Sequence, residues 1–325
     1  MHQRLIQFYS NSLKDAQSQV GGIWGHIIQH YQEPIRNALE TMNPETLEKV
    51  LKKLAESGGL HGLENPTGIT VGSDEFVSMI EKIAHKIGVI PIQNPEQPSS
   101  PENFRITDLQ AIQSDIEDAL GFKIGVPECF GYSVDKPTQV IPHRFFFYCA
   151  AAFTIKSRLA GNVPKDILEI GAGLGNLGWM ARQWGCHSYT VVDLPSVCVM
   201  SSFFLSKCCG ESEVWLFGEG SRKDQFCGFH PASNFSGVLE SSYDVVFNSD
   251  SMPEMPESVR DGYINLIAKC LSPYGFFLSI NHESNKDGQG RVFDSVRRNG
   301  SLKMVSRSPF MMREGYIEEI YCHSD

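Results

Sequence analysis

Residues 167–178 read ILEIGAGLGNLG, an apolar run followed by glycines at the alternate positions 171, 173 and 175. Glycine permits positive φ angles and lets a ligand approach the backbone without meeting a Cβ atom. A helix that begins directly after such a turn presents backbone N–H groups that have no partner within the helix. The stretch therefore predicts a strand, a tight turn and a helix that together bind a nucleotide-like ligand; a turn without a ligand is the alternative.

The sequence around this loop predicts the rest of the sheet. From Lys165 onward short apolar runs alternate with amphipathic stretches, which is typical of repeated β-α units and a parallel sheet. Only about nine residues join the last two predicted strands, too few for a helical crossover, so these two must pair antiparallel. We expect a doubly wound, Rossmann-like α/β fold with a seven-stranded sheet and an antiparallel last strand. The predicted strands are 167–170, 189–192, 214–217, 244–248, 276–280, 302–306 and 316–321.

The first 161 residues predict helices separated by glycine and proline. Helices are expected after Asn43, after Ser73, after a capping box of Thr107 and Gln110, and from Pro142 to Gly161. The last of these is apolar nearly all round, so we expect it to be buried against the C-terminal part of the chain. We therefore divide the chain into a helical cap, 1–161, that shapes a substrate pocket or forms a dimer, and a catalytic domain, 162–325.

Composition excludes several other classes of protein. Lys and Arg total 28 against 38 Asp and Glu, and the resulting net charge of −10 disfavours nucleic acid as a partner. No apolar run reaches the roughly 18 residues that span a bilayer, and the N-terminus lacks an apolar signal core, so we expect a cytoplasmic protein that does not enter membranes. The nine cysteines include no C-x-x-C pair, which favours reduced, buried thiols over a disulfide framework or a zinc site.

The loop glycines also fit the dinucleotide fingerprint G-x-G-x-x-G in a shifted register, over residues 173–178. Two features count against that register. The predicted strand runs into Gly171 and not Gly173, and counted from Gly171 the third glycine is replaced by Asn176. Glu169, two residues before the first glycine, would repel a pyrophosphate, whereas its carboxylate suits a cationic amino-acid moiety.

Asp193 ends the next predicted strand, eighteen residues past Gly175. An acidic side chain at that place can accept both hydroxyls of a ribose. Asp193 could also be the N-cap of a helix that starts at Pro195, and the two roles are compatible.

Together, these motifs resemble the cofactor site of class I S-adenosylmethionine-dependent methyltransferases. Within that class, EIGAG at 169–173, DLP at 193–195, NSDSMPEM at 248–255 and Asn281 resemble the putative sugar O-methyltransferase family over roughly residues 165–285. The resemblance implies S-adenosyl-L-methionine as cofactor and, as substrate, a hydroxyl of a polar small molecule such as a sugar or glycosylated precursor. The cofactor-binding residues it implies are Glu169, Gly171, Ala172, Gly173, Gly175, Asn176, Asp193, Leu194 and Asn248.

Polar residues after the fourth and fifth predicted strands point to the chemistry. Ligands of open α/β sheets lie outside the carboxyl ends of the strands, so these side chains should project into one crevice. An alcohol acceptor needs a base for its proton, and Glu254 or His282 can serve by type, although Glu254 could instead be a surface or capping residue and His282 a solvated loop residue. Asp250, our third catalytic candidate, could alternatively bind a divalent metal together with Asn281 and Glu254. We expect no metal.

Two further residues are candidates for binding the acceptor. Asn281 follows the fifth strand, and His143 opens the apolar helix of the cap, where a core or capping role is the alternative. Other functions stay open at this stage: O-methylation of a polyketide or phenolic secondary metabolite, a nicotinamide-dependent oxidoreductase, and a non-catalytic methyltransferase fold that binds a partner. The sequence also leaves open whether the chain forms a homodimer.

Overall fold

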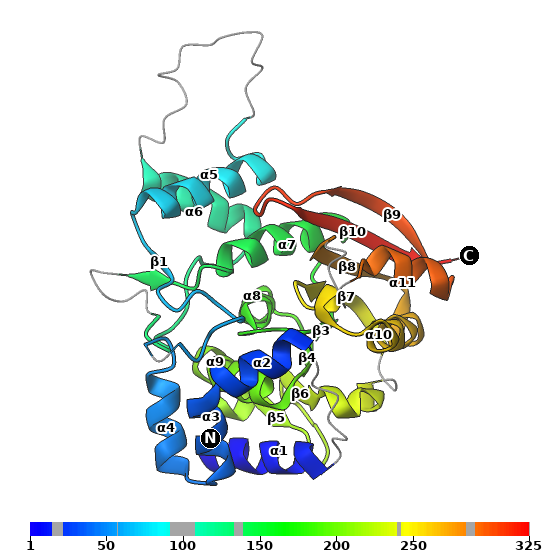
Figure 1. The fold of residues 1–325 in the computed structure, drawn as a ribbon. Coiled ribbons are helices and arrows are strands. Elements are labelled where there is room, and N and C mark those ends of the chain that lie inside the picture. Colours follow the sequence, from blue (N-terminus) through cyan, green and yellow to red (C-terminus); the bar gives the residue numbers. More distant parts are fainter. Residues whose placement is uncertain are drawn as a thin grey trace.

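The computed structural model describes residues 1–14, 22–56, 58–91, 108–132, 139–238, 242–283 and 290–324. Its centre is an eight-stranded sheet in the order β5-β6-β4-β3-β7-β8-β10-β9 (Figure 1). The strands are β3 (Asp166–Ile170), β4 (Ser188–Asp193), β5 (Val214–Leu216), β6 (Cys227–Pro231), β7 (Tyr243–Ser249), β8 (Leu271–His282), β9 (Leu302–Pro309) and β10 (Tyr316–His323).

The direction of the strands confirms the predicted fold class. β3 lies in the middle and pairs parallel with both β4 and β7, while β10 runs antiparallel to β8 and to β9. The carboxyl ends of β3, β4, β7 and β8 therefore meet at one edge of the sheet. This edge is where ligands of open α/β sheets bind.

The sheet has one strand more than the seven predicted, because the sequence gives little sign of β6. Its five residues, CGFHP, contain glycine, histidine and proline and show no apolar periodicity. Position 228 is glycine because a Cβ atom there would lie only 2.4 Å from Nη1 of Arg222. That guanidinium donates to Thr190 Oγ1 at 2.9 Å and so ties this edge of the sheet together.

Helices cover both faces of the sheet. Those after β3 are α8 (Asn176–Trp184), α9 (Pro195–Cys209), α10 (Glu257–Cys270) and α11 (Val292–Asn299). The helices before β3 are α1 (His2–Lys14), α2 (Gly22–His30), α3 (Glu33–Glu40), α4 (Pro44–Lys52), α5 (Asp74–Ile87), α6 (Leu109–Leu120) and α7 (Phe145–Arg158), and a small sheet pairs β1 (Ile69–Thr70) with β2 (Val140–Ile141).

The helices before β3 form two groups (Figure 1). One group, α5 to α7, packs through α7 against α8, and the other, α1 to α4, packs through α1 against α9 and β5. α7 is buried along most of its length, as its apolar composition predicted. One hydrophobic cluster includes buried residues of both groups together with residues of β3, α8 and α9, so the helical region and this face of the sheet share a core.

Some local expectations need correction. The N-cap of α6 is Asp108, whose carboxylate accepts from the backbone N–H groups of Gln110 and Ala111, while Thr107 and most of the proline-rich stretch before it lie outside the described residues. α10 begins at Glu257, with Pro256 at the N-cap position. Within the described residues no helix is long and apolar enough to cross a membrane.

Candidate active site

The glycine loop has the tight geometry that its sequence predicted. Gly171, Gly173 and Gly175 have φ angles of +74°, +56° and +86°, a region that disfavours other residues. A Cβ atom on Gly171 would lie 2.1 Å from the hydroxyl oxygen of Ser251, so this position has no room for a side chain. Gly175 is the N-cap of α8, and the first N–H groups of that helix therefore border the loop.

Glu169 lies directly beneath this loop with its carboxylate fully buried. Neither of its two oxygens has a hydrogen-bond partner among the described residues. Burial, together with the nearby Asp193 carboxylate, raises the pKa of Glu169 well above its ordinary value, against the opposing effect of the nearby Tyr148 hydroxyl. Because buried polar groups are almost always paired, two unpartnered carboxylate oxygens indicate a place where a ligand supplies the missing donors.

Asp193 lies at the end of β4, across from the loop. Its Oδ2 accepts from the Gly173 N–H at 3.2 Å, and its Oδ1 accepts from the Leu194 N–H at 2.7 Å. Burial raises the pKa of Asp193 to about 7 against the effect of these donors. Leu194, not Asp193, holds the N-cap position of α9, so the alternative capping role is wrong.

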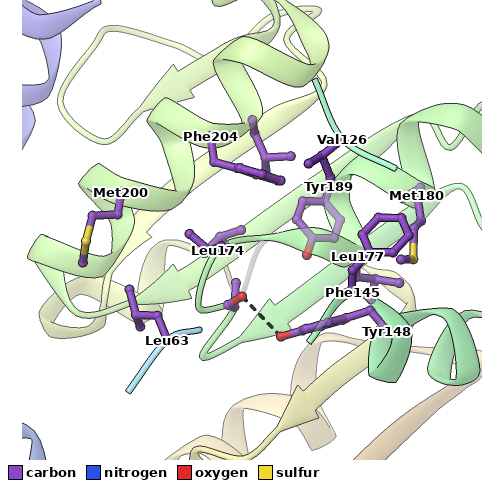
Figure 2. Packing of buried hydrophobic residues seen from close by; sticks show 14 of the residues in the cluster. Leu63, Val126, Phe145, Tyr148, Leu174, Leu177, Met180, Tyr189, Met200 and Phe204 are labelled. Carbon is purple, nitrogen blue, oxygen red and sulfur yellow. Dashed lines mark hydrogen bonds between the residues drawn. The ribbon is translucent and has the colours of Figure 1, made fainter. Parts of the chain in front are cut away.

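Ala172 and Asn176, also predicted for the cofactor, lie on or directly after the same loop, whereas Leu194 precedes α9 and Asn248 is in β7. Asn176 is buried at the start of α8, and its Oδ1 has no partner among the described residues. The carbonyl oxygen of Ala172 accepts from the hydroxyl of Tyr148, on α7, at 3.3 Å (Figure 2). Leu63 lies close by, with its carbonyl oxygen 3.8 Å from where a Cβ of Gly173 would be. The N-terminal region thus covers the cofactor loop directly.

Asn248 and Asn281 form an internal bridge between strand ends. The Asn248 amide donates to the Ile170 carbonyl oxygen at 2.7 Å and to Ser251 Oγ at 2.6 Å, and its Oδ1 accepts from Asn281 Nδ2 at 2.9 Å. These contacts brace β3, β7 and β8 beside the loop. The predicted ligand contacts of both residues stay predictions, although Asn281 Oδ1 is buried without a partner in the part of the chain described.

Asp250, directly after β7, is enclosed by cationic side chains. Its Oδ2 lies 2.8 Å from Nη1 of Arg144 and 2.6 Å from Nη1 of Arg313, and its Oδ1 accepts from the hydroxyl of Tyr316. Burial by itself would raise the pKa of Asp250, but the two arginines outweigh it and hold that pKa below its ordinary value. Asp250 is therefore a permanent anion that anchors two guanidinium groups, which is a poor state for a general base.

Glu254 is in the opposite electrostatic situation. Burial and the nearby Asp250 carboxylate raise the pKa of Glu254 to about 7. Its Oε2 accepts from the indole N–H of Trp24, on α2, at 2.6 Å. The second oxygen, Oε1, is left available to accept a proton, and a pKa near neutrality is what a general base requires.

His282 lies beside these two carboxylates at the end of β8. One potential ligand atom from each of Asp250, Glu254 and His282 falls within 4.8 Å of the others. Burial lowers the pKa of His282, opposed by Asp250 and aided by Arg313. The three groups could surround a cation by type, but the guanidinium groups of Arg144 and Arg313 already neutralise Asp250 and would repel a divalent ion.

A cavity of about 590 Å³ opens beside this cluster. His143 lines it, and its Nε2 lies 3.1 Å from Oε1 of Glu75; its role in acceptor binding stays a prediction. Glu64 also lines it and accepts from the Arg144 backbone N–H at 3.0 Å, which fixes the start of α7. The full lining is His61, Gly62, Glu64, Asn65, Pro66, Met79, His143, Arg144, Phe147, Met312, Arg313 and Glu314.

Sequence reasoning missed three residues of this site. Arg144 directly follows His143, a predicted acceptor-binding residue, so the sequence already pointed to this part of the chain. Nothing in the local sequence marks Arg313 or Trp24, because each meets its partner only through the fold. Trp24 and Glu254, for example, are 230 residues apart along the chain.

Comparison with known proteins gives matches to structures only. No protein-family model and no curated protein sequence matches the chain. The glycopeptide N-methyltransferase MtfA is similar over 52% of this chain and 87% of its own, with 18% identity and a TM-score of 0.39. The N-methyltransferase NodS from Bradyrhizobium japonicum WM9 is similar over 53% of this chain and 93% of its own, with 14% identity and a TM-score of 0.37. Similarity of this size assigns neither an activity nor a substrate to this chain.

Proposed function

We propose that this protein is an S-adenosylmethionine-dependent methyltransferase. The observation that carries the proposal is the pair of unpartnered, fully buried carboxylate oxygens of Glu169 beneath the glycine loop. A cationic amino group satisfies such a carboxylate, whereas a pyrophosphate would add a second anion to it. Asp193, at the neighbouring strand end, has lone pairs left for ribose hydroxyls after accepting its two backbone N–H groups.

The residues present fit this cofactor. Glu169 would hold the amino group of its methionine part, Asp193 its ribose, and the loop from Gly171 to Gly175 would let its chain lie against the backbone. When bound, S-adenosylmethionine supplies an electrophilic methyl group on a sulfonium. The remaining work, which is to place the acceptor and remove its proton, belongs to side chains at the carboxyl ends of β7 and β8.

The acceptor that fits best is a hydroxyl group of a polar small molecule, such as a sugar or a glycosylated precursor. This choice is supported by the resemblance of the 169–173, 193–195 and 248–255 motifs and by a cavity with charged side chains on its wall. Glu254 acts as the base: its Oε1 receives the proton of the acceptor hydroxyl while Oε2 stays bonded to Trp24. A sugar hydroxyl is weakly acidic, so removal of its proton by a base should accelerate methyl transfer strongly.

Calorimetry with S-adenosylhomocysteine and, separately, NAD tests the proposal. We expect saturable binding of S-adenosylhomocysteine and none of NAD, and we expect Asp193→Ala to weaken S-adenosylhomocysteine by about 1–3 kcal/mol, the range for losing a hydrogen bond to a charged group. Glu56→Gln, an exposed site far from the loop in sequence, is the matched control and should bind like the wild type. Saturable NAD binding without any response to S-adenosylhomocysteine would overturn the assignment.

A further inference from the structure

The cavity adjoins the cofactor loop through shared chain segments. Its wall includes Gly62 and Glu64, on either side of the Leu63 carbonyl that faces Gly173. It also includes Arg144, one helical turn before Tyr148, whose hydroxyl donates to the loop carbonyl of Ala172. Two chain segments that line the cavity therefore also contact the glycine loop.

Two guanidinium groups face this cavity from one anchoring point. Arg144 and Arg313 both line it, and each contacts Asp250 through Nη1 alone. Arg313 is further fixed by stacking on the Tyr316 ring, at 4.0 Å from its centroid. A guanidinium carries five N–H donors, so most donors of both groups have no partner among the described residues, and their side chains keep 26% and 35% of their surface exposed.

The two guanidinium groups are only partly neutralised by Asp250, which accepts one contact from each. Glu254, whose pKa is raised to about 7, also interacts with both arginines. Glu64 also lines the cavity, but its oxygens accept backbone N–H groups of Arg144 and Asn65, and burial raises its pKa to about 7. The carboxylate of Glu314 is exposed at the rim, and His143 is paired with Glu75. The two arginines thus keep N–H donors that no carboxylate occupies among the described residues.

We propose that Arg144 and Arg313 form an oxyanion-binding subsite, so that the acceptor of this enzyme carries a carboxylate or phosphate in addition to the hydroxyl that is methylated. Guanidinium forks match the planar oxygens of a carboxylate and those of a phosphate. Asp250 sets the direction of both forks and separates the subsite from Glu254, the base. The anionic group of the acceptor thereby fixes which hydroxyl lies beside Glu254. Neutral sugars lack this group, so we expect the enzyme to bind them more weakly. This substrate class rests on the proposed function, but the subsite itself does not.

Binding of three sugars to the full chain, with S-adenosylhomocysteine present and absent, tests the subsite. The probes are glucuronate, glucose 6-phosphate and neutral glucose, and calorimetry or ligand-observed NMR measures their affinity. We expect one or both anionic sugars to bind at least tenfold more tightly than glucose, and Arg313→Gln to remove that difference. Stronger binding of glucuronate assigns a carboxylate, and stronger binding of glucose 6-phosphate assigns a phosphate.

Two further variants make the result specific. Arg313→Lys keeps the positive charge but loses the paired N–H donors of the guanidinium, so we expect an affinity for anionic sugars between those of the wild type and Arg313→Gln. Arg297→Gln removes an exposed arginine on α11 and should change nothing. Equal binding of all three sugars, or an unchanged preference in a folded Arg313→Gln, overturns the subsite. Anion binding in a protein that ignores S-adenosylhomocysteine would leave the subsite standing and remove the methyltransferase assignment, so the two failures are distinguishable.

Discussion

Glu169 and Asp250 are both buried carboxylates beside the same crevice, yet their surroundings are opposite. The oxygens of Glu169 have no partner among the described residues, and burial raises its pKa well above the ordinary value. Asp250 is bonded to two arginines and a tyrosine, which hold its pKa below the ordinary value despite burial. A buried carboxylate without partners can gain hydrogen bonds from a ligand, so ligand binding is favoured there. A carboxylate whose oxygens already have partners instead fixes the positions of those partners. The side of the crevice that we propose for the cofactor therefore lacks partners for Glu169, whereas the proposed acceptor side already has its Asp250 contacts formed.

The largest expected effect comes from removing the proposed base, Glu254. Glu254→Gln keeps the shape of the side chain but cannot take a proton, so turnover should fall by roughly 10²–10⁴-fold. Affinity for S-adenosylhomocysteine should stay as in the wild type, because Glu254 lies on the acceptor side. Single-turnover kinetics with any accepted substrate measures the effect, with His282→Ala and Asp250→Ala for comparison. A wild-type rate in Glu254→Gln would show that another residue takes the proton.

The next effect distinguishes the two carboxylates directly. Glu169→Gln removes an unpaired buried charge, so the ligand-free protein should gain roughly 1–4 °C in Tm while losing about 10–100-fold in affinity for S-adenosylhomocysteine. Asp250→Asn should do the reverse for stability and lower the Tm, because it leaves two guanidinium groups without their counter-charge. Thermal scans give the Tm of both variants, and calorimetry gives their affinities for S-adenosylhomocysteine.

The pH dependence of this stability difference has a definite sign. Glu169 binds its proton more tightly in the folded than in the unfolded chain, since burial raises its pKa above 4.5. Its contribution to stability is therefore fully present below pH 4.5 and is lost as the pH rises above it. The Tm gain of Glu169→Gln over the wild type should be small near pH 5 and should grow toward pH 8. A gain that is independent of pH would contradict an unpaired carboxylate.

A smaller effect is expected at Trp24. Its indole N–H stabilises the charged form of Glu254, so Trp24→Phe should raise the Glu254 pKa above its value of about 7. The acidic limb of the pH profile of kcat should then move to higher pH, by less than about one unit. Trp215→Phe is a suitable control, because that indole donates to the Glu219 carbonyl at the far edge of the sheet. A purely structural role for Trp24 would lower kcat without moving the profile.

The smallest effect is expected from chelation. The positive charge of Arg144 and Arg313 beside Asp250 disfavours a divalent cation in the cluster of Asp250, Glu254 and His282. EDTA should therefore leave activity unchanged. If EDTA abolished activity and Mg²⁺ restored it, these three groups would be metal ligands and Glu254 could not be the free base.

Local sequence patterns predicted seven of the eight strands of the central sheet and the glycine loop with its positive φ angles. The loop at 171–175 and Glu169 follow from short-range rules: glycines where φ is positive, and a side chain placed by strand alternation. The acceptor side follows from contacts between distant segments, such as Arg313 with Asp250, 63 residues apart. Asp250 was a candidate base or metal ligand by type, and only the fold shows that two arginines occupy it. β6 was missed for a different reason, because its five residues, CGFHP, show no apolar periodicity.

The packing of α1 has a consequence for how the chain is made. α1 lies against α9 and β5, and the Arg4 guanidinium is bonded to Glu219, 215 residues further on. At about 5–20 residues per second, these partners leave the ribosome roughly 10–40 s after α1 does. During that interval the apolar face of α1, which includes Leu5 and Phe8, lacks the cover that α9 and β5 later give it. The packing of α1 is thus completed only after α9 and β5 have been made, and until then its apolar face is open to contact with other chains.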